Sequence, residues 1–384
     1  TPVSHFLAQV NAELPGEAAK IDLTWMDVPT ERLQKIKPSE RGLLLSQIEI
    51  GSYGYVPDTW RRLDDMPRGA WPPDHGGPVG RYSVVEKVDV WAENVRELYE
   101  EAILHRWAPA TDVPWHQLEE LPWHIELALD QVCTRLSEDA LIANQVLNGW
   151  FERIAYGFHD AKLYLASVSF ETARHTEAFR KRALANGGGL GVQGPAWFHR
   201  RVAGSGNFTE FVIHELVQRT SFKRTMCAAL EERAQTGTDR TLFARVGADL
   251  DRQLAYSLGH LEYYVQYNQP ARQDARPQVD FWLWNGERFM ARDITDDGPM
   301  DEALMLVLGD GETVESGKRA LLELRRRQIR EYIERLASAT IPRAPMPQAK
   351  RYDCIAPDLF AIAEPEAWQQ MTAAAPPATG ARVV

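Results

Sequence analysis

The sequence has few cysteines, no long apolar run and no excess of positive charge. Its three cysteines, Cys133, Cys227 and Cys354, lie far apart and form no C-x-x-C metal or redox pair. We expect each of them to be a buried small apolar residue. No apolar run is long enough to span a bilayer, so no membrane partner is expected. The net charge of −11 disfavours nucleic-acid binding, which needs clustered Lys and Arg.

The same features bear on the compartment and on the size of the core. The first residues, TPVSHFLAQV, lack the basic and apolar regions of a signal peptide. Together with the scarce cysteines, this favours a reducing cytoplasm. With 384 residues and 44% hydrophobic content, the chain can bury one large core or two moderate ones.

Apolar residues at helical spacing dominate the chain from Val88 onward. One helix pair is predicted from "PWHQLEELPWHIELAL" to "ARHTEAFRKRALANGGG", with a stop at Gly187 to Gly189. A second pair spans residues 207–269, with a turn at 237–239 and an end at Pro270. "SGKRALLELRRRQIREYIERLASAT" predicts a further helix whose basic run is a solvated face. "VDFWLW" is the segment that most suggests a strand.

These patterns predict an all-α chain whose centre is a four-helix bundle, with extra N- and C-terminal helices. Residues 1–87 are expected to form an N-terminal extension packed on the bundle, and residues 88–340 the helical domain itself. Residues 341–384 are rich in Pro and Ala and are expected to form a tail with a disordered end.

Several stretches of this helical region resemble one known group of proteins. "YEEAILHRWAPATDVPW", "LSEDALIANQV" and "ARHTEAFRKRALANGGGLG" resemble the ferritin-like superfamily, specifically bacterial di-iron oxygenases of the p-aminobenzoate N-oxygenase type. The similarity covers roughly Val88 to Asn268, and in the second helix pair it lies in pattern more than in letters. In that family two irons lie between four helices. One helix of each pair gives a Glu, and the other gives E-x-x-H framed as D-E-x-R-H.

Carried over residue by residue, the resemblance places neutral or basic residues at most of the ligand positions. The first Glu falls on Ala140, and the first E-x-x-H falls on Thr172 and His175, with Glu171 in the framing position and Arg174 retained. In the second helix pair, the position of the Glu ligand falls on Gln218 or Arg219. The Asp, Glu, Arg and His of the framed motif fall, in that order, on Asp249, Leu250, Arg252 and Gln253. Of the family's ligands, His175 alone is kept.

A charge argument indicates that these exchanges belong together. Four buried carboxylates without cations would each cost several kcal/mol of desolvation or would take up protons. A bundle that gives up its irons must therefore give up the acids as well. Arg219 could supply positive charge beside Glu171 or Asp249, while Arg174 and Arg252 are expected to pair with these same two acids as supporting residues.

Removal of two ions and four acids leaves volume between the helices, which larger side chains fill or which stays as a pocket. His175 is the only plausible acid or base at this centre. The alternative is a core histidine bonded to Glu171 or to a helix carbonyl. The neighbouring residues either line a small-molecule pocket or fill the core: Tyr164, Val168, Thr172, Phe179, Ala140, Gln218, Arg219, Leu250, Gln253 and Tyr256.

Three functions remain open from the sequence. The first is a ferritin-like protein that has lost its metal site, needs no cofactor, and binds or converts a small organic molecule at His175, with a biosynthetic role as one expectation. The second is a non-haem iron oxygenase with rearranged ligands, namely Glu171, His175, Asp139 and Glu215. The third is a non-catalytic partner subunit of an oxygenase. The resemblance also implies a homodimer.

Overall fold

The computed structural model describes residues 36–48, 56–60, 82–186, 189–267, 275–348 and 351–373. Apart from isolated bridges, the regular elements of these residues are helices, which confirms the predicted all-α chain. The chain divides into two compact units, residues 1–48 and residues 49–384. In the first unit the structure describes a short helix, α2 (Leu45–Ile48). The helical bundle belongs to the second unit.

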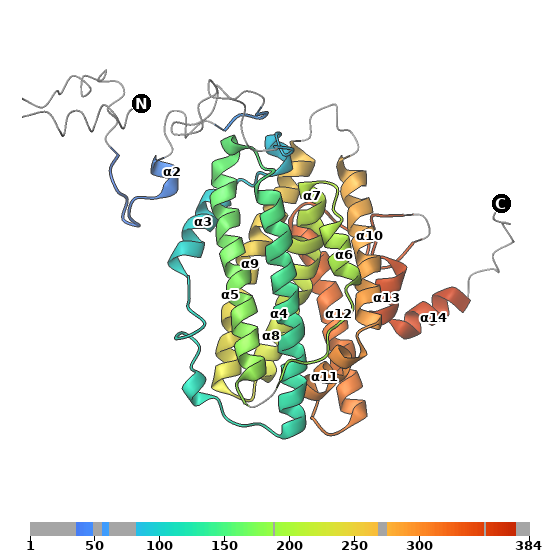
Figure 1. Cartoon of the computed structure of the whole chain (residues 1–384). Coiled ribbons are helices and arrows are strands. Elements are labelled where there is room, and N and C mark those ends of the chain that lie inside the picture. The colour runs from blue at the N-terminus through green and yellow to red at the C-terminus, as the bar shows by residue number, and fades with distance from the viewer. Residues whose placement is uncertain are drawn as a thin grey trace, which may run out of the picture. The chain divides into compact units, whose positions relative to one another are not determined.

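Two pairs of long helices form the bundle (Figure 1). In the first pair, α4 (Trp123–Phe151) packs along α5 (His159–Leu184). In the second pair, α8 (Thr220–Arg233) packs along α9 (Gly237–Gln266), and α8 is preceded without a break by α7 (Phe208–Phe211) and the π-helix η7 (Val212–Arg219). The predicted four-helix bundle of two consecutive pairs is therefore confirmed.

A second layer of helices covers the side of the bundle formed by α4, η7 and α8. In this layer α10 (Ala275–Thr295) packs on η7, α11 (Gly298–Leu308) on α4, and α12 (Val314–Ser338) on α8. The other elements are α3 (Val95–Leu104), α6 (Trp197–Ala203), α13 (Pro357–Ala363), α14 (Pro365–Ala373), η4 (Lys87–Asp89), η5 (Trp115–Gln117) and η6 (Tyr156–Phe158).

Three local predictions from the sequence need correction or fall outside the described residues. The segment VDFWLW lies in α10 and is not a strand, because Val279, Leu283 and Met290 recur at helical spacing on the buried side. The predicted turn at 237–239 is the first turn of α9, where the Thr236 side chain accepts a hydrogen bond from the Asp239 backbone N–H at 3.0 Å. Gly187, Gly188 and Pro270 lie outside the described residues.

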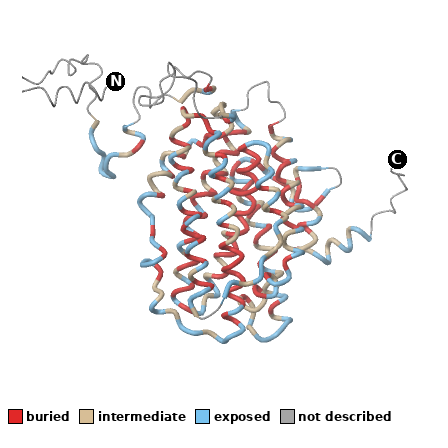
Figure 2. The backbone as a smooth tube through the Cα atoms, in the orientation of Figure 1, coloured by how far each residue is buried: buried red, intermediate tan, exposed pale blue. Residues whose placement is uncertain are grey.

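The interior of the bundle has two apolar clusters with polar residues between them, and Figure 2 shows the buried residues along the long helices. One cluster includes Leu147, Trp150, Tyr164, Val168, Val212, Leu216, Tyr256 and Leu261. The other includes Val132, Leu136, Ala178, Phe179, Met226, Leu230, Phe243 and Leu250. Each bundle helix passes from one cluster to the other through what we call the polar belt, defined as Asp139, Glu171, Thr172, Arg174, His175, Arg219, Lys223, Asp249, Arg252 and Gln253.

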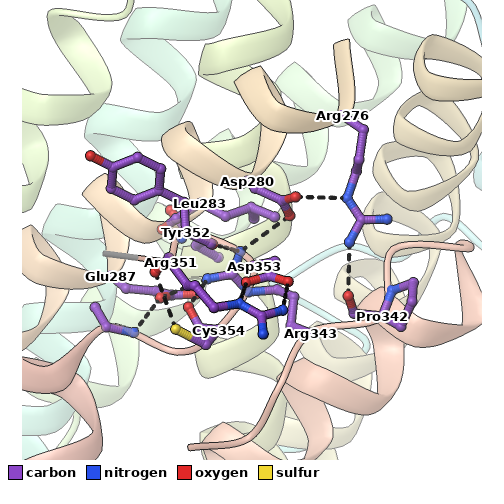
Figure 3. A network of polar contacts seen from close by, with 12 residues as sticks. Arg276, Asp280, Leu283, Glu287, Pro342, Arg343, Arg351, Tyr352, Asp353 and Cys354 are labelled. Atoms are coloured by element: carbon purple, nitrogen blue, oxygen red, sulfur yellow. Dashed lines mark hydrogen bonds and ion pairs between the residues drawn. The ribbon is translucent and has the colours of Figure 1, made fainter. Parts of the chain in front are cut away.

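A second buried network fixes the chain beyond α12 (Figure 3). Glu287 of α10 accepts hydrogen bonds from Arg343 at 2.8 and 3.0 Å, from the Tyr332 hydroxyl at 2.9 Å and from the Ala356 backbone N–H at 2.7 Å. Arg343 also donates to the Cys354 carbonyl at 2.6 Å. Burial raises the pKa of Glu287 above its ordinary value. This network holds Arg343, Cys354 and Ala356 against α10 and α12.

The segment predicted as a tail therefore takes part in the core. Leu359 and Phe360 of α13 belong to the larger apolar cluster, while residues 374–384 lie outside the described residues. The three domain boundaries stay predictions. All three cysteines are buried, as expected. Among the described residues, no helix combines the length and the apolar character that crossing a bilayer requires.

We expect Arg343→Met to lower the free energy of unfolding by about 3 kcal/mol or more, because it leaves the Glu287 carboxylate buried without its cation. Arg351→Met is the matched control, since Arg351 pairs with Asp353 at the surface with 53% of its side chain exposed. Such a surface pair contributes about 1 kcal/mol or less. Urea unfolding measures both changes. Equal losses in the two variants would contradict the role given to this network.

Candidate functional site

The polar belt is organised around Asp249 of α9. Its Oδ2 accepts hydrogen bonds from Arg174 Nη2 at 2.6 Å, from the Trp107 indole N–H at 2.9 Å and from His175 Nε2 at 3.0 Å. Its Oδ1 accepts from Arg252. Burial alone raises the pKa of Asp249, but the hydrogen bond from His175 and the charge of Arg174 outweigh burial and lower it. Asp249 therefore joins α9 to α5 as a carboxylate.

Glu171 of α5 forms the second half of this cluster. Its Oε1 accepts from Arg252 at 2.8 Å, and its Oε2 accepts from Gln253 Nε2 at 3.0 Å. Burial, followed by the charge of Asp249, raises the pKa of Glu171 to about 7. Both predicted ion pairs are present, with Arg252 on Glu171 and Arg174 on Asp249.

Two predicted site residues beside these acids have defined partners. His175 is 3% exposed, and burial lowers its pKa, so its imidazole is neutral near pH 7. It is a core histidine bonded to Asp249, where the sequence suggested Glu171 or a carbonyl. Thr172 donates to the Val168 carbonyl at 3.1 Å and accepts from Asn144 of α4 at 3.1 Å. Thr172 therefore connects the two helices of the first pair.

These contacts decide whether the belt suits a di-metal centre. The charges of Arg174 and Arg252 balance those of Glu171 and Asp249, and every oxygen of the two carboxylates already accepts a hydrogen bond. A di-metal centre needs carboxylate oxygens directed at the ions and a Glu-x-x-His pair on two helices. Within the described ranges, no group of three or more His, Cys, Asp or Glu residues could hold a metal ion. The residues of the belt do not fit such a centre.

The other half of the belt lies on α4, η7 and α8. Asp139 accepts from His199 Nε2 at 2.8 Å and from Arg219 Nη1 at 3.4 Å. Burial raises the pKa of Asp139, but the charges of Arg135 and Arg219 lower it well below its ordinary value. Glu215 accepts from Lys223 at 3.2 Å, and its other oxygen is 3.5 Å from Arg219 Nε. The acids of the rearranged ligand set are thus occupied by cations.

Arg219 is the residue whose expected position was wrong. It lies beside Asp139 and Glu215, not beside Glu171 or Asp249. The reason is the π-helix η7, whose wider turn shifts the side chains of residues 212–219 relative to an α-helix. Gln218 consequently faces α10 and donates to the Leu283 carbonyl at 2.6 Å. A Cβ atom on Gly286 would lie 2.0 Å from Gln218 Oε1, so a glycine is needed at this contact.

A pocket lies beside this half of the belt, between the bundle and the outer layer. It holds about 610 Å³ of space free of atoms, part of it open to solvent. Its apolar lining residues are Leu136, Phe198, Phe222, Met226, Met290, Ile294 and Met300. Its polar lining residues are Arg135, Asp139, Arg219, Lys223, Asp293, Asp297, Asp301, Arg325 and Gln328.

Of the predicted pocket residues, Arg219 lines this pocket, and the others are buried elsewhere in the bundle. Tyr164 and Tyr256 have ring centroids 5.0 Å apart and belong to the larger apolar cluster with Val168. Phe179 and Leu250 belong to the smaller apolar cluster. Ala140, Thr172, Gln218 and Gln253 are also buried.

The sequence did not point to the residues that α10, α11 and α12 bring to the pocket. Arg325 lies in the basic run of α12, which was predicted to be a solvated face, yet Arg325 is 5% exposed. Met290 and Met300 carry no polar signal that distinguishes them from other core residues. The apolar spacing of α12 places Leu324 and Gln328 beside Arg325 on the buried side and is the one signal that was available.

Comparisons with known proteins add little beyond architecture. No protein-family model matches the chain, and no curated protein matches it. Among solved structures, an R2-like ligand-binding oxidase, determined as a point mutant with an aerobically reconstituted Mn/Fe cofactor, is similar with a TM-score of 0.41 and 11% sequence identity. The match covers 64% of this chain and 94% of that one.

We expect Asp249→Asn to lower the free energy of unfolding by about 3 kcal/mol or more, because it leaves buried guanidinium groups without their counter-charge. Asp251→Asn on the same helix is the matched control, since the Asp251 side chain is 55% exposed and pairs with Arg224 at the surface. Its loss should be about 1 kcal/mol or less. A urea titration that gives equal losses would rule out a central role for Asp249.

The raised pKa of Glu171 predicts a pH dependence. Between pH 4.5 and about 7 the folded state holds a proton on Glu171 that the unfolded state has released. The contribution of Glu171 to the free energy of unfolding is therefore lost as the pH rises from 4.5 to about 7. The free energy of unfolding of the wild type, minus that of Glu171→Gln, should fall from pH 4.5 to pH 7. A difference that is constant or rises with pH would show that the pKa of Glu171 is not raised.

Proposed function

We propose that this chain binds a small organic molecule in the pocket between α4, α8 and α10 to α12, in a bundle that works without a di-metal centre. The observation that carries the proposal is the pocket itself. The exposed area of its wall is mainly apolar, and charged side chains also line it, so it combines the apolar surface and the polar groups of a small-molecule site. No other cofactor is part of the proposal.

The lining residues suit a ligand with an apolar body. Met226, Met290 and Met300 come from three different helices, and unbranched methionine side chains adapt to the shape of a bound molecule. Phe198 and Phe222 add aromatic surface. These five side chains come from α6, α8, α10 and α11, so the pocket depends on the packing of the outer layer against the bundle.

The charge balance of the belt supports the metal-free part of the proposal. The two carboxylates nearest the former ligand positions, Glu171 and Asp249, are neutralised by arginines. Conversion of the bound molecule, with His175 as acid or base, stays a prediction, because the His175 Nε2 atom is engaged with Asp249. A homodimer and a cytoplasmic location likewise stay predictions.

The proposal predicts that toluene, a small apolar probe, binds to the wild type and that Met290→Trp weakens its binding at least tenfold by filling the pocket. Met346→Trp is the control, since Met346 is 49% exposed and lies outside the pocket. Ligand-observed NMR gives the dissociation constants, and Met226→Phe serves as a second filling variant. Equal binding to all variants would contradict the proposed site.

Elemental analysis of protein produced with added iron and manganese tests the second part of the proposal. We expect far less than one transition-metal ion per chain, because the belt has no free carboxylate pair to hold two cations. Two ions per chain would favour an oxygenase with rearranged ligands.

A further inference from the structure

We infer that the ligand is a neutral, mainly apolar molecule that presents a carbonyl-type oxygen to Arg219 and Arg325. The inference rests on the proposed function and specifies its ligand. Three features of the pocket support it. Among the described residues, two buried nitrogen donors at the pocket lack a hydrogen-bond partner, and the cationic and acidic side chains that line the pocket are equal in number. The third feature is the composition of the apolar wall.

The donors are nitrogen atoms of two buried arginines that line the pocket from opposite layers. Arg219 belongs to η7 and Arg325 to α12, and each residue is 5% exposed. In the part of the chain that the structure describes, Nη2 of Arg219 and Nε of Arg325 are buried without a hydrogen-bond partner. A buried donor without a partner is costly, so an acceptor oxygen that reaches these groups from the pocket would be stabilising.

The other nitrogens of both arginines are held in place. Arg325 Nη2 donates to Asp301 at 2.6 Å, and its Nη1 donates to Gln328 at 2.9 Å. Arg219 Nη1 donates to Asp139, and the guanidinium carbon Cζ lies 4.7 Å from the centre of the Phe198 ring. The spare N–H groups are therefore fixed in position before a ligand arrives, which lowers the entropy cost of binding.

The charges around the pocket indicate that the ligand is neutral. Four cationic and four acidic side chains line it: Arg135, Arg219, Lys223 and Arg325, and Asp139, Asp293, Asp297 and Asp301. The acids already have cationic partners, for example Asp293 and Asp297 on Arg135 at 2.6 and 3.2 Å. A bound carboxylate would add a buried charge without a counter-ion, which is costly. A ketone or an amide satisfies the donors without that cost.

The apolar wall suits a ring system. Met226, Met290 and Met300 offer thioether sulfurs, which make favourable contacts with aromatic rings. Acetophenone is therefore a suitable probe, because it joins a phenyl ring to a carbonyl oxygen. Benzoate has the same ring with a carboxylate, and toluene has the same ring without a hydrogen-bond acceptor.

The test compares the dissociation constants of acetophenone, benzoate and toluene by ligand-observed NMR. We expect acetophenone to bind about tenfold more tightly than toluene, as hydrogen bonds to charged donors contribute about 1.5–3 kcal/mol, and benzoate to bind most weakly. Arg219→Lys and Arg325→Lys keep the charge but remove the spare donor. Each should reduce the preference for acetophenone to threefold or less and leave toluene binding within twofold of the wild type.

Arg319→Lys on α12 is the matched control, since the Arg319 side chain is 76% exposed, and it should leave all three constants unchanged. If either lysine variant unfolds, Arg219→Met or Arg325→Met is measured in its place. Absence of toluene binding would count against the proposed function itself. Toluene binding with no preference for acetophenone, or with benzoate as the tightest probe, would overturn this inference alone.

Discussion

Neutralisation of buried charge inside the bundle is the constraint on which the rest of the structure depends. A guanidinium or carboxylate group taken out of water is costly unless an opposite charge and hydrogen bonds meet it. Asp249 meets this condition with donors from α5, from α9 itself and from Trp107. Because these donors must all reach one carboxylate, the registers of α5 and α9 are fixed relative to each other. The apolar clusters on either side of the belt then pack in a single arrangement.

The same constraint keeps the pocket from collapsing. Protein interiors rarely contain voids, because helices shift until their side chains fill the space. Here the outer layer is attached to the bundle by charges at the edge of the pocket. Arg135 of α4 pairs with Asp293 of α10 at 2.6 Å and with Asp297, the residue before α11, at 3.2 Å. Closer approach of the helices would distort these pairs, so the apolar space between them persists.

The sequence allowed the fold and half of the belt to be predicted. Apolar spacing predicted the helix pairs, and the exchange of family carboxylates for neutral residues such as Thr172 and Leu250 stays a prediction from the resemblance. The ion pairs of Arg174 and Arg252 followed from their framing positions. The pocket could not be predicted, because its walls come from residues distant in the sequence, such as Arg135 and Asp293. The π-helix also moved Arg219 and Gln218 to other faces, and nothing in the sequence of η7 shows such a turn.

The position of the pocket follows from how side chains fill the centre of the bundle. Arg174 extends over the Trp107 ring, 4.9 Å from its centre, while donating to Asp249. Arg252 and Gln253 occupy the space between Asp249 and Glu171. The centre of the bundle is thereby filled with side chains whose polar groups are largely satisfied. Among the described residues, Arg174 and Arg252 also carry a buried nitrogen without a partner, but Arg219 and Arg325 line the pocket at the junction with the outer layer, and this is where a ligand can add a hydrogen bond that the protein lacks.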